Sequence, residues 1–509
     1  MEKLLKRKNT LIGTNNINAL IYGAMLIFWL WLYFNAPYTN DDWDWGLPVG
    51  MEQLLTASVN SRYAGNLVIV SITRSRFVKT VFCGLVAWAV PFCISRVDPE
   101  LEARHRLNVF LLSNLLLLTM NKSVWQQSYG WLAAFANYVT SGLCLVLMYT
   151  VLRRYFSGRL PAFGAKAAIG LFALVFVSML FIENLALYFL VVIALCFVIA
   201  IVQKRDLKYP ALMMAAAVLG LVLMFSSPVY GTLLSEGRSV GREMNFAGAT
   251  SLLDVISSAV AMLAYLLPGM YEVNVGLCLL ALLVVSAMLW LQRQGGAIVP
   301  ACFTLLNAAM ALMILLNSIS GAVPEILRRA DGNTHLSIVL FLLLALELLW
   351  LVAFGREREF TLVQCFLWLS TMVVILPLLV TKNSGSRLFY SLYVLVALMA
   401  AELWVYGAKR FDFSARATAV LAVLLLVPVL LCSAYTANVY RMIGKIDRQQ
   451  RSIIAQALEN GDGQVYLPAY SPLHQKFVFG AMAEGEYRLG FFKQFYGLDD
   501  SVEIIYIEE

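Results

Sequence analysis

Long apolar runs alternate with short polar stretches along almost the whole chain. A helix needs about 20 mostly apolar residues to cross the hydrocarbon core of a membrane, and by that rule the chain holds about thirteen spans. They are predicted at about 17–36, 77–96, 107–120, 134–152, 165–182, 184–202, 209–227, 274–291, 298–317, 337–354, 361–380, 388–406 and 416–435. The pattern therefore predicts an all-α polytopic membrane protein.

One apolar stretch, Thr250–Leu267, leaves two interpretations open. It either spans the membrane, or it lies on or dips into the outer surface. The second interpretation keeps the later Lys- and Arg-bearing loops on the cytoplasmic side, so we favour it.

Composition and charge agree with a membrane protein. The chain has 509 residues, of which 61% are hydrophobic and 14% are charged, whereas soluble globular chains are nearer 45–50% apolar and about 25% charged. The net charge of +7 records which loops stay in the cytoplasm and says little about nucleic acid. The basic segment Met1–Asn16 places the N-terminus inside, and the first run is longer than a signal-peptide core, so it is read as a retained span.

The chain divides by composition into a transmembrane domain (residues 1–435) and an extracytoplasmic C-terminal lobe (residues 436–509). Hydrophobic spacing and turn residues predict four elements in this lobe. They are a helix at Tyr440–Asn460 stopped by Gly461, strands at Gln464–Leu467 and Val502–Ile507, and a helix at Gly485–Tyr496. We expect a small α/β lobe on the outer face.

The candidate chemistry lies in the first outer loop, residues 37–76, where Asp41, Asp42 and Asp44 fall within four residues. The sequence contains no Walker A motif and no GxGxxG after a strand, so an outer catalytic face would need a pre-activated substrate such as a polyprenyl-linked phosphate sugar. A carboxylate would take the proton of the acceptor hydroxyl, and cations would stabilise the departing phosphate. Asp41 and Asp42 are the candidate catalytic residues. The alternative is a solvated interfacial loop, with Trp43 and Trp45 in the aromatic belt.

Further polar residues assigned to the outer side are candidates for binding substrate. They are Asp44, Arg62, Asn66, Gln127, Tyr129, Glu183, Arg328, Arg329, His335, Lys382 and Arg387. Interpretations without substrate binding stay open. The basic side chains could touch lipid headgroups, and Glu183 could be an interfacial turn residue, although carboxylates at membrane depth are usually functional. The eight cysteines lie in apolar runs, and neither they nor the three histidines have metal-ligand spacing, so no metal site is predicted.

At these motifs the chain resembles the GT-C superfamily of polyprenyl-phosphate-sugar glycosyltransferases. Asn40-Asp41-Asp42-Trp43, followed by Ser61-Arg62-Tyr63-Ala64-Gly65-Asn66, is similar to bacterial multispanning proteins that are related in plan to the O-antigen serotype-converting glucosyltransferases. Four shorter stretches also look like that family's pattern: Gln127–Gly130, Ile182–Asn184, Gly385–Arg387 and Phe495–Leu498.

The resemblance implies an inverting hexosyltransferase of the bacterial cytoplasmic (inner) membrane. It would move a hexose from a polyprenyl-phosphate donor to a cell-envelope glycan, such as the O-antigen of lipopolysaccharide, or to a lipid-linked acceptor. It also implies that Asp41 or Asp42 is the base, that Arg62 and Arg387 lie near the donor phosphate, and that Glu183 faces the cavity. Because the chain has Asp-Asp with a third aspartate nearby, which carboxylate is the base stays open. Some members use a divalent cation, Mg²⁺ or Mn²⁺, and the sequence does not decide this.

Two other functions fit a many-span envelope protein. One is a polymerase or ligase of lipid-linked oligosaccharide, although such proteins tend to rely on arginines in large outer loops. The other is a flippase or transporter, which would be favoured by broken helices in matched positions of two halves. The sequence shows no convincing internal repeat.

Overall fold

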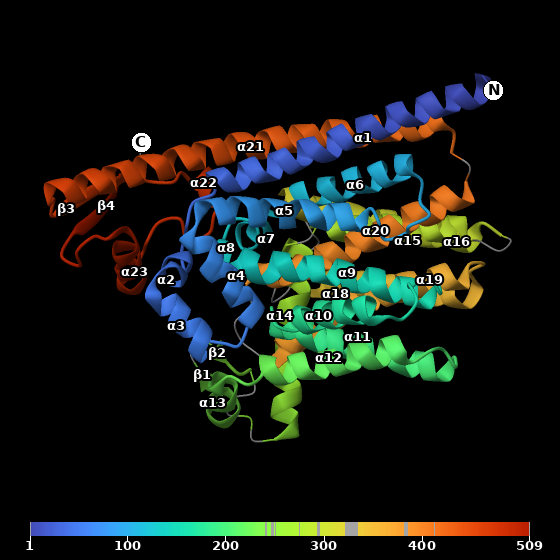
Figure 1. Cartoon of the computed structure of the whole chain (residues 1–509). Coiled ribbons are helices and arrows are strands. Elements are labelled where there is room, and N and C mark those ends of the chain that lie inside the picture. Colours follow the sequence, from blue (N-terminus) through green and yellow to red (C-terminus); the bar gives the residue numbers. More distant parts are fainter. Residues whose placement is uncertain are drawn as a thin grey trace. The chain divides into compact units, whose positions relative to one another are not determined.

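The computed structural model describes residues 2–239, 242–245, 249, 251–273, 275–292, 296–320, 334–380, 385–411 and 413–507, and it is mostly helical (Figure 1). A helix lies at every predicted span. Among the described residues, eight helical segments are long and apolar enough to cross a membrane, or nine if α12 (Lys208–Met224) and α13 (Pro228–Glu236) form one span. The prediction of a helical multi-pass protein is confirmed. The number of thirteen spans stays a prediction, because only the described residues are counted here.

By contacts within the structure, the chain forms two compact units. Unit 1 comprises Met1–Leu118, Trp125–Ser227 and Phe413–Glu509, and unit 2 comprises Thr119–Val124 and Pro228–Asp412. The C-terminal segment therefore belongs to the same unit as the acidic loop. A domain boundary at residue 435 stays a prediction.

Unit 1 is built on three long helices that lie side by side (Figure 1). They are α1 (Glu2–Asn35), α5 (Arg76–Ile94) and α21 (Ala415–Asn460). The remaining long helices of this unit are α6 (Ala103–Leu118), α9 (Thr140–Phe156), α10 (Ala165–Ser178), α11 (Glu183–Val202) and α12. The short α8 (Leu132–Ala134) and the π-helical turn η1 (Phe135–Val139) continue directly into α9.

Three short helices fill the loop between α1 and α5. They are α2 (Asp42–Gly46), α3 (Pro48–Thr56) and α4 (Tyr63–Arg74). The sequence predicts one or two helices over Met51–Thr73, and α3 and α4 confirm two. The helical turn α2 was not predicted, since five residues give too little periodicity to recognise a helix.

The C-terminal lobe has the predicted elements with one difference. Helix α21 runs unbroken from Ala415 to Asn460, so the last predicted span and the predicted lobe helix are one helix. It ends at Gly461, whose φ of 70° is the left-handed conformation that glycine adopts without strain. Three elements follow: β3 (Gln464–Pro468), which pairs in parallel with β4 (Glu503–Ile507), and α23 (Glu486–Tyr496) between them. The turn α22 (Pro472–Gln475) follows β3.

Unit 2 is also helical. Its long helices are α14 (Leu252–Val273), α15 (Val275–Leu291), α16 (Ile298–Ser320), α18 (Thr334–Phe354), α19 (Arg358–Val373) and α20 (Tyr390–Arg410). Its short elements are α13, β1 (Arg238–Ser239), β2 (Arg242–Glu243), η2 (Leu376–Val380) and η3 (Ser386–Phe389). Within the ambiguous stretch Thr250–Leu267, residues 252–267 lie in α14, and whether this stretch crosses the membrane stays open.

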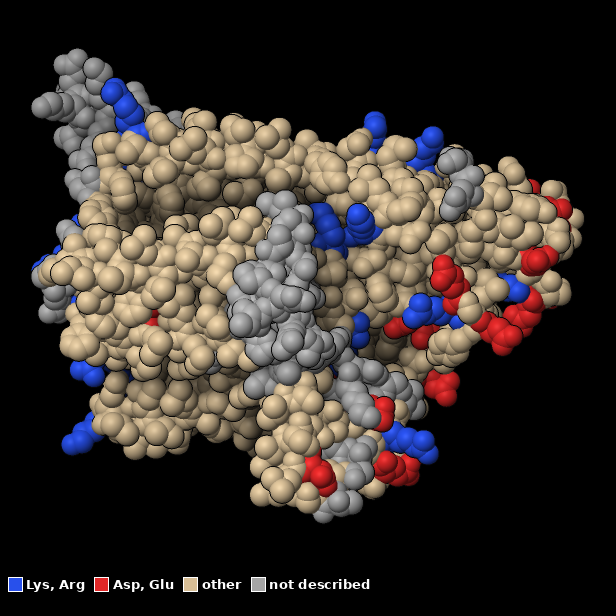
Figure 2. Space-filling model, turned by 180° about the vertical axis from the view of Figure 1, so that it is seen from behind, with Lys and Arg blue, Asp and Glu red and all other residues tan. Residues whose placement is uncertain are grey.

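Apolar side chains cover the outside of many of these helices. Leu424 and Leu431 of α21 and Val202 of α11 are largely exposed. Figure 2 shows wide areas without Lys, Arg, Asp or Glu, with most charged side chains gathered near the edges of the face. Apolar helix faces turned outward are what a lipid environment favours.

Candidate active site

The acidic loop is fixed to the C-terminal lobe by close backbone contact. The amide of Asn40 donates to the carbonyl of Gly480 at 3.2 Å. Gly480 has a φ of +60°, and a Cβ there would lie 2.9 Å from Asn40 Cβ, so glycine is required both for conformation and for space. Asn40 itself adopts a positive φ of 53°, which asparagine tolerates better than most residues.

Asp42 has a structural role at the centre of the loop. Its side chain is 0% exposed. Oδ2 accepts from the amide of Thr39 at 2.9 Å, and Oδ1 accepts from the amide of Ala133 at 2.8 Å. The second bond caps the first turn of α8, where backbone N–H groups otherwise lack partners. Asp42 thus joins its own loop to the α8–η1–α9 helix.

Burial also changes the acidity of the two neighbouring carboxyls. Desolvation raises the pKa of Asp42 to about 8, although the amides of Thr39 and Ala133 oppose the shift. Asp44 is 9% exposed, and burial raises its pKa to about 7, with a further rise from the charge of Asp41. Asp41 is half-buried. Of the three, Asp41 is therefore the carboxylate most open to a substrate.

The shifted pKa values predict that the folded acidic loop loses stability as pH rises. An unfolded aspartate loses its proton near pH 4, whereas folded Asp42 and Asp44 hold theirs to about 8 and about 7. Between these limits the folded loop binds more protons, so its free energy of unfolding falls with rising pH. We expect amide-exchange protection over residues 39–46, corrected for intrinsic rates, to fall about tenfold or more between pH 5 and pH 8. Asp44→Asn should flatten part of this dependence, and equal protection at both pH values would contradict the prediction.

Arg74 fixes the other end of α2. Its Nη1 donates to the carbonyl of Trp45 at 2.8 Å, and its Nη2 donates to the carbonyl of Leu47 at 2.8 Å. These are carbonyls at the C-terminal end of the helix, where a cation is favourable. Arg74 ends α4, so it ties the two short helices together.

Aromatic rings from α23 cover the acidic loop. Phe492 meets Trp43 edge to face at 5.2 Å between ring centroids, and Phe495 meets Tyr38 in the same manner at 5.6 Å. A Cβ on Gly46 would lie 2.3 Å from the Phe495 ring. At the other end of α23, Tyr487 is 71% exposed, and its pKa is raised by burial and by the charges of Asp44 and Asp41. Figure 1 shows α23 beside α2.

Arg62 and Glu183, both predicted as substrate-binding residues, bind each other. Arg62 Nη2 lies 2.7 Å from Glu183 Oε2, and Arg62 Nε donates to both carboxylate oxygens at 3.2 and 3.0 Å. The pair joins the start of α4 to the start of α11. Asn66 supports the same turn, because its Nδ2 and the amide of Arg62 both donate to Asn60 Oδ1.

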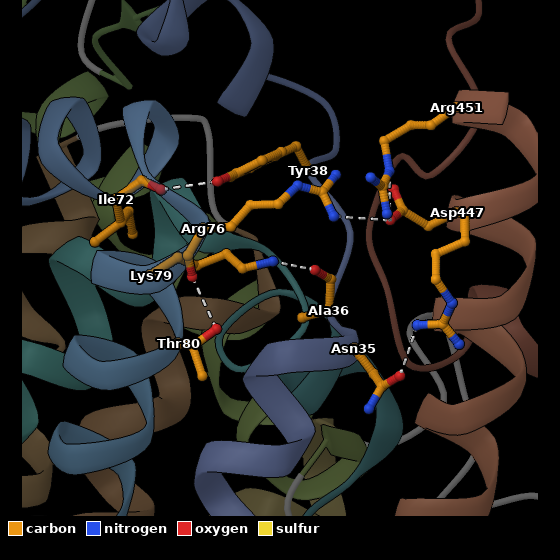
Figure 3. A network of polar contacts seen from close by, with 10 residues as sticks. Asn35, Ala36, Tyr38, Ile72, Arg76, Lys79, Thr80, Asp447 and Arg451 are labelled. Carbon is orange, nitrogen blue, oxygen red and sulfur yellow. Dashed lines mark hydrogen bonds and ion pairs between the residues drawn. The ribbon is translucent and has the colours of Figure 1, made fainter. Parts of the chain in front are cut away.

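A group of basic side chains surrounds Asp447 of α21 (Figure 3). Arg451 Nη2 lies 3.0 Å from Asp447 Oδ2, and Arg76 Nη1 lies 3.4 Å from the same oxygen. Lys79, which is buried, donates to the carbonyl of Ala36, and its Nζ lies 4.8 Å from the centre of the Tyr38 ring.

Arg448 adds a further cation to this group, because its Nη1 donates to Asn35 Oδ1 at 3.2 Å. We call Arg76, Lys79, Arg448 and Arg451 the basic cluster. Asp447 pairs with Arg76 and Arg451, whose side chains are 39% and 33% exposed, whereas Arg448 and Lys79 bond to the neutral oxygens of Asn35 and Ala36. The basic cluster therefore has the charge and the access to bind an anion.

Asp41 and Asp44 lie toward the N-terminal end of α23, whereas Tyr38 and the basic cluster beside it lie toward the C-terminal end. The charges of Asp41 and Asp44 act on Tyr487. Burial raises the pKa of Tyr496, and the charge of Asp447 adds to this rise while those of Arg76 and Arg451 oppose it. At about 1.5 Å of rise per residue, these two tyrosines are about 13–14 Å apart along the helix.

The remaining predicted binding residues lie elsewhere. Tyr129 is buried, and its ring stacks on Trp125 at 4.8 Å and on Trp29 at 5.3 Å between ring centroids. Packing in the protein interior therefore explains the position of this ring. Gln127, in the same segment, is half-buried. Arg387 is half-buried in η3 of unit 2.

Four other predicted residues have side chains that the structure does not describe. Arg328, Arg329 and Lys382 lie outside the described residues, and His335 is described as a helical residue of α18 without its side chain. Within the described part of the chain, no group of three or more His, Cys, Asp or Glu residues could hold a metal ion. Use of Mg²⁺ or Mn²⁺ stays a prediction.

The roles of Arg74 and of most of the basic cluster are not evident from the sequence. One local signal was present, since Asp447 and Arg451 have the i, i+4 spacing of a helical ion pair. Arg76 carries no such local signal. Its pairing with Asp447 joins residues 371 positions apart in the chain, which no local pattern reveals.

Comparison with known proteins gives no relative. No protein-family model matches the chain. No curated protein and no solved structure matches it. Function is therefore inferred from the site itself.

Proposed function

We propose that the protein is an integral membrane glycosyltransferase with a GT-C-like arrangement of about thirteen spans. It moves a hexose from a polyprenyl-phosphate donor to a cell-envelope glycan or lipid-linked acceptor on the outer face of the bacterial inner membrane. The observation that supports this most is the way in which the side chains of the acidic loop are held in place. Asp42 is fixed by two backbone amides, Arg74 binds the carbonyls at the end of α2, and the half-buried Asp41 is the least buried of the three carboxylates.

In the proposed reaction, Asp41 is the general base. The acceptor hydroxyl oxygen attacks the anomeric carbon from the face opposite the phosphate, and the bond from that carbon to the phosphate oxygen breaks. Asp41 takes the hydroxyl proton as the new bond forms, and the leaving phosphate keeps the electron pair. Because there is one displacement, the anomeric configuration inverts. Asp42 and Asp44 act as positioning residues, since burial and backbone bonds hold them.

The basic cluster is the proposed site for the donor phosphate. Arginine forks bind phosphate oxygens in pairs, and cations that meet the leaving group stabilise the charge that develops on it. The cluster lies beside Tyr38, three residues before Asp41, which supports a role in the same site.

Weakening the basic cluster should raise the KM for donor. Arg451→Gln and Arg76→Gln each remove one arginine fork, and we expect KM to rise about tenfold with a smaller change in kcat. Arg441→Gln is the matched control, because Arg441 is exposed on the same helix and bonds to Asn438. Donor-dependent initial rates measure the effect. Equal KM values in all three variants would contradict the assignment of the basic cluster to the donor site.

The test of the function is transfer of radiolabelled sugar by the purified protein in lipid bilayers. A panel of polyprenyl-phosphate hexoses serves as donors, and envelope extract serves as acceptor. We expect label transfer from at least one donor, with product anomeric configuration opposite to that of the donor by NMR. Extension of long chains would indicate a polymerase or ligase, and lipid-linked sugar movement without transfer would indicate a flippase.

A further inference from the structure

A buried carboxylate in unit 2 lacks the partners that such a group needs. Glu347 lies in the apolar helix α18 and is 0% exposed. Among the described residues, neither of its carboxylate oxygens accepts a hydrogen bond. An ionised carboxylate in such surroundings is strongly unfavourable, and ionisable groups at membrane depth usually have a function.

The polar side chains next to Glu347 come from two other helices. Asn307 of α16 is buried and interacts with the Glu347 carboxyl. Its Nδ2 donates to Ser286 Oγ of α15 at 2.8 Å. Within the described residues, Asn307 Oδ1 has no donor. The Asn307 amide thus lies beside the Glu347 carboxyl, and the carboxyl oxygens of Glu347 and the Oδ1 of Asn307 are all buried acceptors without a donor among the described residues.

We propose that Glu347, Asn307 and Ser286 form a proton-binding site whose ligand is one proton on Glu347. The carboxylic O–H donates to Asn307 Oδ1, and Asn307 Nδ2–H donates to Ser286 Oγ. One proton thus gives a partner to an oxygen of Glu347 and to Asn307 Oδ1 at once. It completes a chain of hydrogen bonds through α18, α16 and α15. The site lies within unit 2 and does not depend on the proposed transferase activity.

Carbodiimide labelling tests for the proton directly. Dicyclohexylcarbodiimide is lipid-soluble and adds to protonated carboxylic acids, and Leu346 and Leu349 expose the neighbouring face of α18 to it. With the full chain in lipid bilayers, we expect a mass-spectrometric adduct on Glu347 that is absent from Glu347→Gln. Glu402 of α20, which is also buried, serves as a comparison site read from a separate peptide. No adduct on Glu347 would overturn the proposal.

Two further variants separate a proton from simple packing. Glu347→Gln replaces the carboxylic O–H by an amide N–H that can still donate to Asn307, so we expect an unchanged Tm. Glu347→Ala leaves Asn307 Oδ1 without a donor, and we expect its Tm to fall by several degrees. The infrared difference spectrum between the unmutated protein and Glu347→Gln should contain the C=O band of a protonated carboxylic acid, because Asp42 and Asp44 contribute equally to both samples. A Gln variant as unstable as the Ala variant, or a difference spectrum without this band, would contradict the proposed site.

Discussion

Replacing Asp41 by Asn should reduce sugar transfer by about 10²–10⁴-fold, the range expected for loss of a general base. The amide cannot take the acceptor proton, but it has nearly the shape of the carboxylate. Folding should be unaffected, because Asp41 is half-buried. Its charge also raises the pKa of Asp42 and Asp44, so removing that charge relieves repulsion among the three carboxyls. Transfer of labelled sugar by purified variant in bilayers, with Tm measured on the same sample, checks both expectations.

Two further variants make this result specific. Asp500→Asn changes an exposed aspartate whose backbone carbonyl, not its side chain, binds Lys493, so it should keep full activity. Asp42→Asn should lower the Tm as well as the activity, because its amide nitrogen would face one of two backbone N–H groups. An unpaired buried donor costs about 1–3 kcal/mol. Full activity in Asp41→Asn would assign the base elsewhere, with Asp44 as the next candidate.

Adding one methyl group at Gly130 should detach the C-terminal lobe from the acidic loop. A Cβ there would lie 1.9 Å from the carbonyl oxygen of Phe477 and 3.0 Å from that of Gln126. Both neighbours are backbone atoms, and the first belongs to the segment that donates from Phe479 to the Gly130 carbonyl at 3.3 Å. Gly130→Ala must therefore move one segment away from the other, at a cost of about 1–3 kcal/mol or more. We expect a lower Tm, faster proteolysis after α21 and a large loss of transfer.

Gly490→Ala is the matched control for this prediction. A Cβ at Gly490 meets nothing within 4 Å, and the residue lies inside α23. Alanine favours a helix interior over glycine by about 1 kcal/mol, so this variant should be as stable as the unmutated protein or slightly more. If Gly130→Ala kept normal protease resistance and activity, the docking of the lobe through this segment would be wrong.

The acidic loop depends on the C-terminal lobe for its form. Asn40 binds Gly480, Trp43 meets Phe492, and Tyr38 meets Phe495. Loss of the lobe should therefore impair catalysis even though the proposed base lies more than 400 residues earlier in the chain. This dependence explains why packing at Gly130 is expected to affect transfer.

The sequence by itself determined the helical multi-pass class and the position of most helices. Apolar runs of about 20 residues are a strong signal, because backbone groups in lipid must be bonded within the helix. It also predicted the strands of the lobe, the end of α21 at Gly461 and the concentration of carboxylates after α1. These features depend on residues that are near one another in the chain.

Tertiary structure alone decided which of these residues work together. The sequence treats Asp41 and Asp42 as equivalent, and burial with two backbone bonds distinguishes them. Arg62 and Glu183 form an ion pair across 121 positions, and Arg76 joins Asp447 across 371. Burial and long-range pairing arise only when distant helices pack, so no local pattern of residues could reveal them.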